Sequence, residues 1–249
     1  MISISVRSDA DAAITALTQR RSQIPFATAA AITRTAYKVQ DAEYKEMIDV
    51  FDRPTPYTLN SLAVKGATKQ DLSAVVYLKY AFDKGTPADK YLSPEIKGGS
   101  RPLKRFERAL ISVGAMPPDY FAVPGAAADM DQYGNMKTAQ IVQILSYFRA
   151  FPEAGYKANI TQEKKARLAK GSKRRLGFVY FVGRPGGGKL PLGVWQRVGF
   201  SQGSAVRPIL IFVNGANYPV RFDFQYVAQQ TIAKEFPAQM QAALAEYAQ

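Results

Sequence analysis

Small and apolar residues recur every three or four positions from Pro25 to Phe51, and this run limits the possible folds more than any other feature. The spacing places these residues on one face of a helix, and proline is tolerated in a first helical turn. The segment Asp52-Arg53-Pro54-Thr55-Pro56 then ends the pattern. The sequence therefore predicts a long helix over 25–51, which must bury its apolar face against another element.

A shorter helix is predicted before this one. Asp9 can cap a helix that runs to about Arg21. It follows a start in which the apolar residues Ile2, Ile4 and Val6 alternate with polar ones. Such alternation is typical of a strand with one buried face.

Strands are predicted in two parts of the chain. Leu59 to Lys65 and Leu72 to Lys79 are rich in Val, Leu and Tyr, and the polar residues between them indicate a hairpin. Three further candidates follow in the last third of the chain, at Leu176 to Val182, Leu192 to Val198 and Val206 to Val213. In the last of them, Pro208 marks an edge strand or a bulge.

Further helices are predicted at 101–113, 136–150 and 222–235, and Pro237 is expected to restart a helix that runs to Tyr247. The order of elements predicts an α+β fold, in which an antiparallel sheet packs against long N-terminal and C-terminal helices, with extended loops and a protruding hairpin. We expect a single domain over 1–249. Its long insertions are the irregular segments 80–100 and 114–135, a basic arm at 156–175 and a Gly-rich hairpin tip at 183–190.

The 249 residues include no histidine and no cysteine. These two residues supply most nucleophile–base pairs and most transition-metal ligands. Ser-His-Asp and Cys-His sites, zinc sites, iron–sulfur clusters and disulfides are thereby excluded. We expect a binding or structural protein with no catalytic residues, no cofactor and no metal.

The net charge of +13 is unevenly distributed. Ten cationic residues lie between positions 157 and 189 beside one acid, Glu163; they are Lys157, Lys164, Lys165, Arg167, Lys170, Lys173, Arg174, Arg175, Arg184 and Lys189. A solvated arm, a nucleic-acid contact and an acidic protein neighbour are the three interpretations. No aromatic residue lies between Tyr156 and Phe178, which favours phosphate contact or an acidic subunit over base stacking.

The segment Gly183 to Lys189 has the spacing of a phosphate-binding loop, G-x-x-x-x-G-K. The next residue is Leu190 instead of Ser or Thr, and Pro191 and a strand follow where a helix is needed. A flexible basic hairpin tip is the favoured interpretation. The candidate residues for contact with a partner or DNA are Lys164, Lys165, Arg167, Lys170, Lys173, Arg174, Arg175, Arg184, Gly186, Gly187, Gly188 and Lys189.

Asp129, Asp131, Gly134 and Asn135 imitate the first half of an EF-hand loop. Gln140 stands at the twelfth position, where calcium needs a bidentate Glu. A turn that caps the following helix is therefore favoured over a calcium site.

Carboxylate chemistry does not require histidine or cysteine. The acids, such as Glu95, Glu107 and Asp119, are scattered along the chain, and we expect exposed carboxylates. A carboxylate- or divalent-cation-dependent enzyme remains an alternative function, and a DNA-binding protein without sequence specificity is another.

Three segments carry a resemblance to a known family: the small-residue helix Ala29-Ala30-Ala31-Ile32-Thr33-Arg34-Thr35-Ala36, the basic centre, and Tyr218-Pro219-Val220 before the last helix. Together they resemble tail-completion or neck proteins of tailed bacteriophages and prophages, in particular the minor tail protein Z family. The resemblance implies a structural virion protein that forms a homo-oligomeric ring and joins the portal or head to the tail. Its implied partners are portal, adaptor and tail proteins, and packaged DNA is a possible further contact.

No apolar run approaches the roughly 20 residues needed to cross a bilayer. The first eight residues also lack a charged region followed by an apolar stretch and a cleavage site. We expect a soluble protein without membrane contact, made in the cytoplasm of a bacterial host.

Overall fold

The computed structural model describes residues 10–79, 86–152, 159–173 and 175–247, and the side chains from residue 21 onward within these ranges. The chain forms two compact units, Met1–Ile96 with Val220–Gln249 (unit 1) and Lys97–Pro219 (unit 2). The sequence led us to expect one domain. Each unit instead has buried apolar clusters of its own, so each is described by itself.

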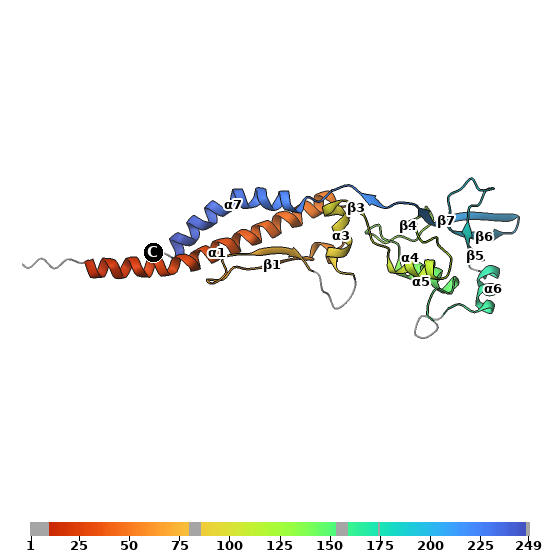
Figure 1. The fold of residues 1–249 in the computed structure, drawn as a ribbon. Coiled ribbons are helices and arrows are strands. Elements are labelled where there is room, and N and C mark those ends of the chain that lie inside the picture. Colours follow the sequence, from red (N-terminus) through yellow and green to blue (C-terminus); the bar gives the residue numbers. More distant parts are fainter. Residues whose placement is uncertain (1–9, 80–85, 153–158, 174, 248–249) are drawn as a thin grey trace, which may run out of the picture. The chain divides into compact units, whose positions relative to one another are not determined.

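The fold class is α+β, as predicted (Figure 1). Unit 1 is mainly helical and contains one small sheet. Its elements are α1 (Ala10–Val50), α2 (Pro56–Leu59), β1 (Leu62–Lys65), β2 (Val75–Leu78), α3 (Ala88–Lys97) and α7 (Phe224–Tyr247).

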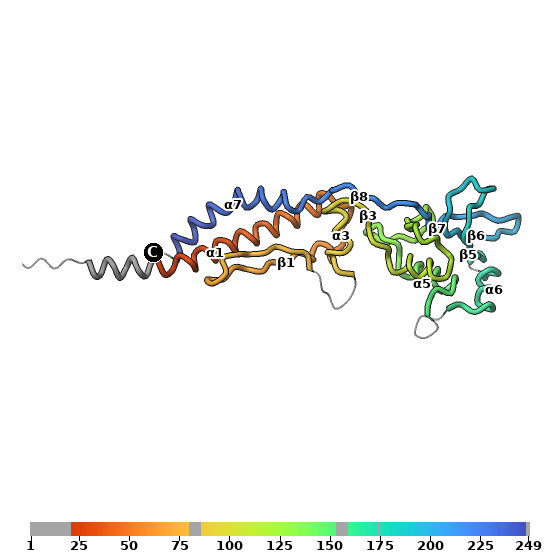
Figure 2. Tube along the Cα trace, in the orientation of Figure 1, coloured from red at the N-terminus to blue at the C-terminus, as the bar shows by residue number. Residues whose placement is uncertain are grey.

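Helices α1 and α7 pack side by side in opposite directions, as Figure 2 traces. On α1 a row of residues at intervals of four is buried: Ala27, Ala31, Thr35, Val39, Glu43 and Met47. Residues spaced by four form a ridge that fits the groove of a neighbouring helix. At one end of the pair the ridge meets Ala243, and at the other end Met47 shares a cluster with Phe222.

Two helix breaks predicted from proline are wrong. Pro25 lies inside α1 and does not begin a second helix, and Pro237 lies inside α7. Each proline removes one backbone hydrogen bond from its helix. In α7, Phe236 and Met240 on either side of Pro237 pack against the cluster of Ala27, Ala31 and Ala243, and this packing offsets the loss. Asp9 and the alternating segment 2–6 lie outside the described residues.

The hairpin predicted at 59–79 is confirmed with shorter strands. β1 and β2 pair antiparallel, from Leu62 opposite Leu78 to Lys65 opposite Val75, and the resulting two-stranded sheet packs on α1. The irregular segment predicted at 80–100 is wrong for residues 88–97, which form α3. Buried Leu92 anchors α3 in the same cluster as Met47.

Unit 2 is built on a four-stranded antiparallel sheet. Its elements are β3 (Gly99–Ser100), α4 (Arg105–Ser112), β4 (Phe121–Pro124), α5 (Thr138–Tyr147), α6 (Gln162–Lys170), β5 (Phe178–Gly183), β6 (Gly193–Phe200), β7 (Gly203–Val213) and β8 (Asn217–Tyr218). The strand order of the larger sheet is β4-β7-β6-β5, and β3 pairs with β8. Leu110 of α4 and Ile144 of α5 are buried against this sheet, so these two helices cover it.

The three strands predicted between 176 and 213 are confirmed as β5, β6 and β7. Pro208 marks a bulge, because Val194 pairs with Leu210 but Trp195 pairs with Pro208. Ile209 is thus the extra residue, and its side chain is buried. The irregular segment predicted at 114–135 is wrong for β4, which pairs with β7 on the side away from β6.

Candidate functional site

Helix α6 carries four of the candidate cationic residues. Lys164, Arg167 and Lys170 are exposed along it, whereas Lys165 is half-buried with its ammonium 4.6 Å from the centre of the Tyr147 ring. Within the basic arm expected at 156–175, residues 162–170 form a helix. The Thr161 hydroxyl accepts a hydrogen bond from the Lys164 N–H and caps the helix, and Leu168 packs on the core of unit 2.

The turn after α6 adds two more exposed cations, Lys173 and Arg175. Gly177 follows at a point where a Cβ atom would lie 2.0 Å from the carbonyl oxygen of Ala169, so no side chain fits there. The close approach ties the end of α6 to the start of β5. Arg174, also a candidate, lies outside the described residues, as does Lys157.

The Gly-rich tip joins β5 to β6, which confirms the hairpin interpretation. Gly186, Gly187 and Gly188 all have φ between 68° and 85°, a conformation that side chains other than glycine rarely adopt. Arg184 and Lys189 are exposed on either side of them. A strand follows the loop where a phosphate-binding loop needs a helix, so the tip has no helix N-terminus to hold a phosphate.

The candidate cations form two separate groups. Phe178, at the start of β5, follows the α6 turn, and Gly183, at its end, leads into the Gly-rich tip. Because a strand rises about 3.3 Å per residue, the groups lie on the order of 17 Å apart along β5. The structure therefore assigns the two groups to opposite ends of one strand, and they do not form one patch.

Among the described residues, no carboxylate is within ion-pair distance of either group. Arg167 and Lys170 lie in the last turn of α6, where cations interact favourably with the helix dipole. The helix dipole therefore gives a reason for Arg167 and Lys170 at this end of α6 that does not require a binding partner. It does not apply to Arg184 and Lys189 at the tip.

The segment resembling an EF-hand is a turn. The Asp131 carboxylate accepts hydrogen bonds from the N–H groups of Tyr133 (2.9 Å) and Asn135 (2.8 Å). The Gln140 side chain accepts one from the N–H of Asp129 (2.7 Å). These bonds confirm that the segment is a turn. Its expected role as a helix cap is not seen, because Lys137 is the N-cap of α5 and makes no side-chain cap bond. Within the described ranges, no three acidic side chains are grouped so that they could hold a metal ion.

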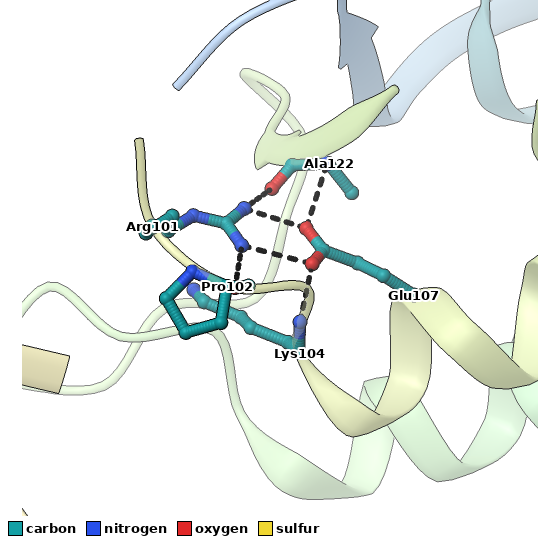
Figure 3. Close-up of polar contacts among 5 residues, drawn as sticks. All are labelled: Arg101, Pro102, Lys104, Glu107 and Ala122. Carbon is teal, nitrogen blue, oxygen red and sulfur yellow. Dashed lines mark hydrogen bonds and ion pairs between the residues drawn. The ribbon is translucent and has the colours of Figure 1, made fainter. Parts of the chain in front are cut away.

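Glu107 is the centre of a buried polar cluster in unit 2 (Figure 3). Its carboxylate accepts hydrogen bonds from the Arg101 guanidinium (2.8 Å), from the Lys104 N–H (2.6 Å) and from the Ala122 N–H (2.8 Å). Burial alone would raise the pKa of Glu107, but these hydrogen bonds outweigh it and hold the pKa below its ordinary value. The cluster joins the segment before α4, α4 itself and β4, and its oxygens are fully used in doing so.

The expectation of exposed carboxylates is thus wrong for Glu107. Asp119 is exposed, and Glu95 of unit 1 is half-buried. Burial raises the pKa of Glu95, although nearby Arg221 opposes the shift. The Glu107 carboxylate is bound in an ion pair with Arg101, so it is not free to act as a general acid or base.

Glu43 is an unusual residue in the buried ridge of α1. Its side chain is 0% exposed, and neither carboxylate oxygen has a hydrogen-bond partner in the part of the chain that the structure describes. Burial raises its pKa to about 8, and the negative charges of Glu46 and Asp223 act in the same direction. Glu43 is therefore mostly protonated at neutral pH.

Unit 1 carries two apolar surfaces. The sequence places Tyr37, Tyr44 and Ile48 in the apolar stripe of the helix predicted at 25–51, and the expectation that this face is buried is wrong for these three side chains. An apolar groove of about 330 Å³ lies on α1 between β2 and α7; it is lined by Ile32, Thr35, Ala36, Val39, Ala74, Val76, Phe224, Ala228, Ile232 and Phe236. An apolar row of Tyr37, Tyr44 and Ile48 is exposed elsewhere on α1. Since each residue turns a helix by about 100°, Tyr37 lies roughly opposite Thr35 and Val39 of the groove.

A periodicity argument can find the apolar row, because Tyr37, Tyr44 and Ile48 share one helix face at spacings of seven and four. The groove depends on how three distant segments pack, and no sequence signal marks it. None of the helices among the described residues combines the length and the apolar character that crossing a bilayer requires. Comparison with protein-family models, curated proteins and solved structures finds no match to this chain.

Proposed function

We propose that this chain is a structural virion protein of a tailed bacteriophage, a ring-forming neck or tail-completion subunit between the portal and the tail. The observation that carries the proposal is the pair of apolar surfaces on opposite sides of α1, the row Tyr37, Tyr44, Ile48 and the groove beside β2. Apolar surface left exposed on a folded chain marks contact with other proteins. In a ring, each subunit contacts its two neighbours through two different surfaces.

The charge distribution supports the same proposal. Two exposed cationic groups at the ends of β5 can reach acidic neighbouring subunits or packaged DNA, and the Gly-rich tip projects one of them beyond the sheet. The resemblance to the minor tail protein Z family agrees with a role of this kind. The proposed site of action is the virion, at the neck or tail end.

Electron microscopy of purified particles that carry a labelled copy of this chain tests the proposal. We expect the label at the junction of head and tail, and we expect the purified chain to sediment as an oligomer. A chain that stays monomeric at high concentration and is absent from particles would refute the proposal.

Shortening the Gly-rich tip should impair assembly without unfolding the subunit. Replacement of residues 185–190 by Asn-Gly keeps the pairing of Gly183 with Gly193, and it keeps Pro191, whose carbonyl accepts the indole hydrogen bond of Trp195. We expect the free energy of unfolding to change by less than about 1 kcal/mol. The yield of complete particles should fall at least tenfold.

The matched control for this variant keeps the tip at full length and replaces Arg184 and Lys189 by serine. Loss of assembly in both variants assigns the effect to charge, and loss only in the shortened variant assigns it to reach. Normal particle yield from the shortened variant would contradict a role of the tip as an intersubunit contact.

A second candidate function, DNA binding without sequence specificity, is favoured by the exposed row Lys164, Arg167 and Lys170. If this row contacts phosphates, replacing all three by serine should weaken duplex binding and reduce the slope of log K against log salt by about 3. Filter binding at roughly 50 to 200 mM salt measures both the duplex affinity and its salt dependence. An unchanged slope would rule out contact between this row and DNA.

A further inference from the structure

The apolar groove of unit 1 borders a strand that has one unpaired edge. Among the described residues, β2 pairs only with β1. The N–H of Lys79 donates to the carbonyl of Ser61, so Ser61 and Lys79 form a hydrogen-bonded pair of the antiparallel ladder. Every second pair along the ladder is of the same kind. The backbone groups of Val76 and Leu78, in the intervening pairs, therefore point away from β1.

The side of β2 that offers these groups also borders the groove. Val76 of β2 and Ala74 just before it line the groove, together with Phe224, Ala228 and Ile232 of α7 and Val39 of α1. A site with an open strand edge on one wall and an apolar floor is suited to an added strand. Such a strand must place apolar side chains at every second position toward α1 and polar ones toward solvent.

We propose that residues 2–6 of a second copy of this chain occupy the groove as a third strand beside β2. In this segment Ile2, Ile4 and Val6 alternate with Ser3 and Ser5, which is the pattern that the groove requires. The segment lies outside the described residues. The proposal rests on the homo-oligomeric part of the proposed function and names the contact that links one subunit to the next.

The donor must be another copy because the segment cannot reach the groove of its own chain. α1 begins at Ala10, and the groove begins at Ile32. Twenty-two residues of helix span roughly 33 Å. Val6 is four residues from Ala10 and can lie at most about 14 Å from it. A segment tied to Ala10 at that distance cannot reach the groove of its own chain, so the donor we propose is a neighbouring copy.

Exchange of this kind gives each subunit one donor segment and one acceptor groove. The resulting contact is heterologous, and it closes into a ring when the rotation between neighbours permits. Backbone hydrogen bonds to Val76 and Leu78 would contribute to the affinity, and the alternating apolar side chains would set the register.

A peptide of residues 1–8 (MISISVRS) with a fluorescent label tests the proposal directly. The acceptor is the full chain with Ile2→Ser, Ile4→Ser and Val6→Ser, which leaves the groove intact and disables the chain's own donor. We expect saturable binding of the peptide by fluorescence anisotropy. A control peptide with the same three serines should bind at least tenfold more weakly.

Two matched substitutions in the acceptor locate the binding site. Ile232 is 46% exposed at the groove, and Ile48 is 47% exposed in the apolar row. Ile232→Glu should weaken peptide binding at least tenfold, and Ile48→Glu should leave it unchanged. Equal effects of the two substitutions, equal binding of both peptides, or no binding would overturn the proposal.

Sedimentation separates this proposal from the proposed function. If the triple-serine chain no longer forms the oligomer of the natural chain, the donor role is supported. If it forms the same oligomer, the strand exchange is refuted while the ring proposal stands. If the natural chain is monomeric, both proposals fail, even where the free peptide binds the groove.

Discussion

Replacement of Glu107 by alanine is expected to destabilise unit 2 by about 3–5 kcal/mol, because it leaves the Arg101 guanidinium buried without its partner. The side chain of Arg101 is only 10% exposed, and that of Glu107 is 0% exposed. The substitution also leaves the N–H groups of Lys104 and Ala122 without their acceptor. Urea denaturation followed by tryptophan fluorescence measures the loss, since Trp195 lies in the same unit.

Two further variants separate the contributions at this cluster. Glu107→Gln keeps an acceptor for one N–H group but loses the charge, so we expect an intermediate loss. The double variant Arg101→Leu/Glu107→Leu removes both charges, yet the two N–H groups remain unsatisfied, and it should stay less stable than the natural protein. If Glu107→Ala unfolds at the same urea concentration as the natural chain, the cluster does not hold α4 to β4.

The pKa of Glu107 also fixes the pH dependence of this effect. Because the folded protein holds this pKa below its ordinary value, the carboxylate stabilises the fold above that ordinary value. The stabilisation is lost as the pH falls through the lower, folded-state pKa. The difference between the natural chain and Glu107→Ala should therefore shrink in acid.

Replacement of Glu43 by glutamine is expected to stabilise unit 1, and the gain should grow with pH. The folded-state pKa is about 8, against an ordinary value of 4.5, so folding favours the protonated acid. This contribution to the free energy of unfolding of the natural chain is greatest below the ordinary pKa, and it decreases as the pH rises toward 8. At pH 7 glutamine, which carries no charge, should gain roughly 3 kcal/mol over the natural residue.

Thermal unfolding followed by circular dichroism at pH 4, 7 and 8.5 checks this expectation. The matched control is Asp49→Asn, an exposed acid on the same helix, whose loss should change stability by no more than about 0.5 kcal/mol. A gain from Glu43→Gln that is equal at all three pH values would contradict burial of an ionisable carboxyl as its cause.

Elements with one strongly apolar face could be predicted from the sequence. β5, β6 and β7 lie where Val, Ile, Leu and Phe are dense, and α5 lies where Ile141, Ile144 and Leu145 follow helical spacing. In these segments local preference and tertiary burial agree. At Pro208 the sequence predicted an edge strand or a bulge, because proline cannot donate to the ladder, and the structure has the bulge.

Other elements depend on partners that are distant in the sequence. Pro25 favours a helix start by local rules, yet α1 runs through it from Ala10, and after the proline Ala27 and Ala31 share a buried cluster with Ala243 of α7. β4 has only four residues, and it exists because the outer edge of β7 is available for pairing. The division into two units follows from which distant residues share a buried cluster, and no local sequence pattern indicates this.

The candidate site could be predicted only as a list of cations. Charge and glycine content identified α6 and the tip, yet they could not indicate that β5 separates the two groups. The burial of Glu107 and Glu43 has no local signal, because an acid in a helical sequence is usually exposed. The groove could not be predicted either, because Val39, Val76 and Ile232 come from three separate segments.

The small side chains at one end of the α1–α7 pair imply that the free energy of local opening differs between its two ends. Ala27, Ala31 and Ala243 allow the two backbones to approach closely, but each buries little apolar area. Met47 and Phe222 at the other end bury far more. Opening of the pair should therefore begin at the alanine end, near Tyr247, and the segment around Met47 should act as the hinge that remains closed.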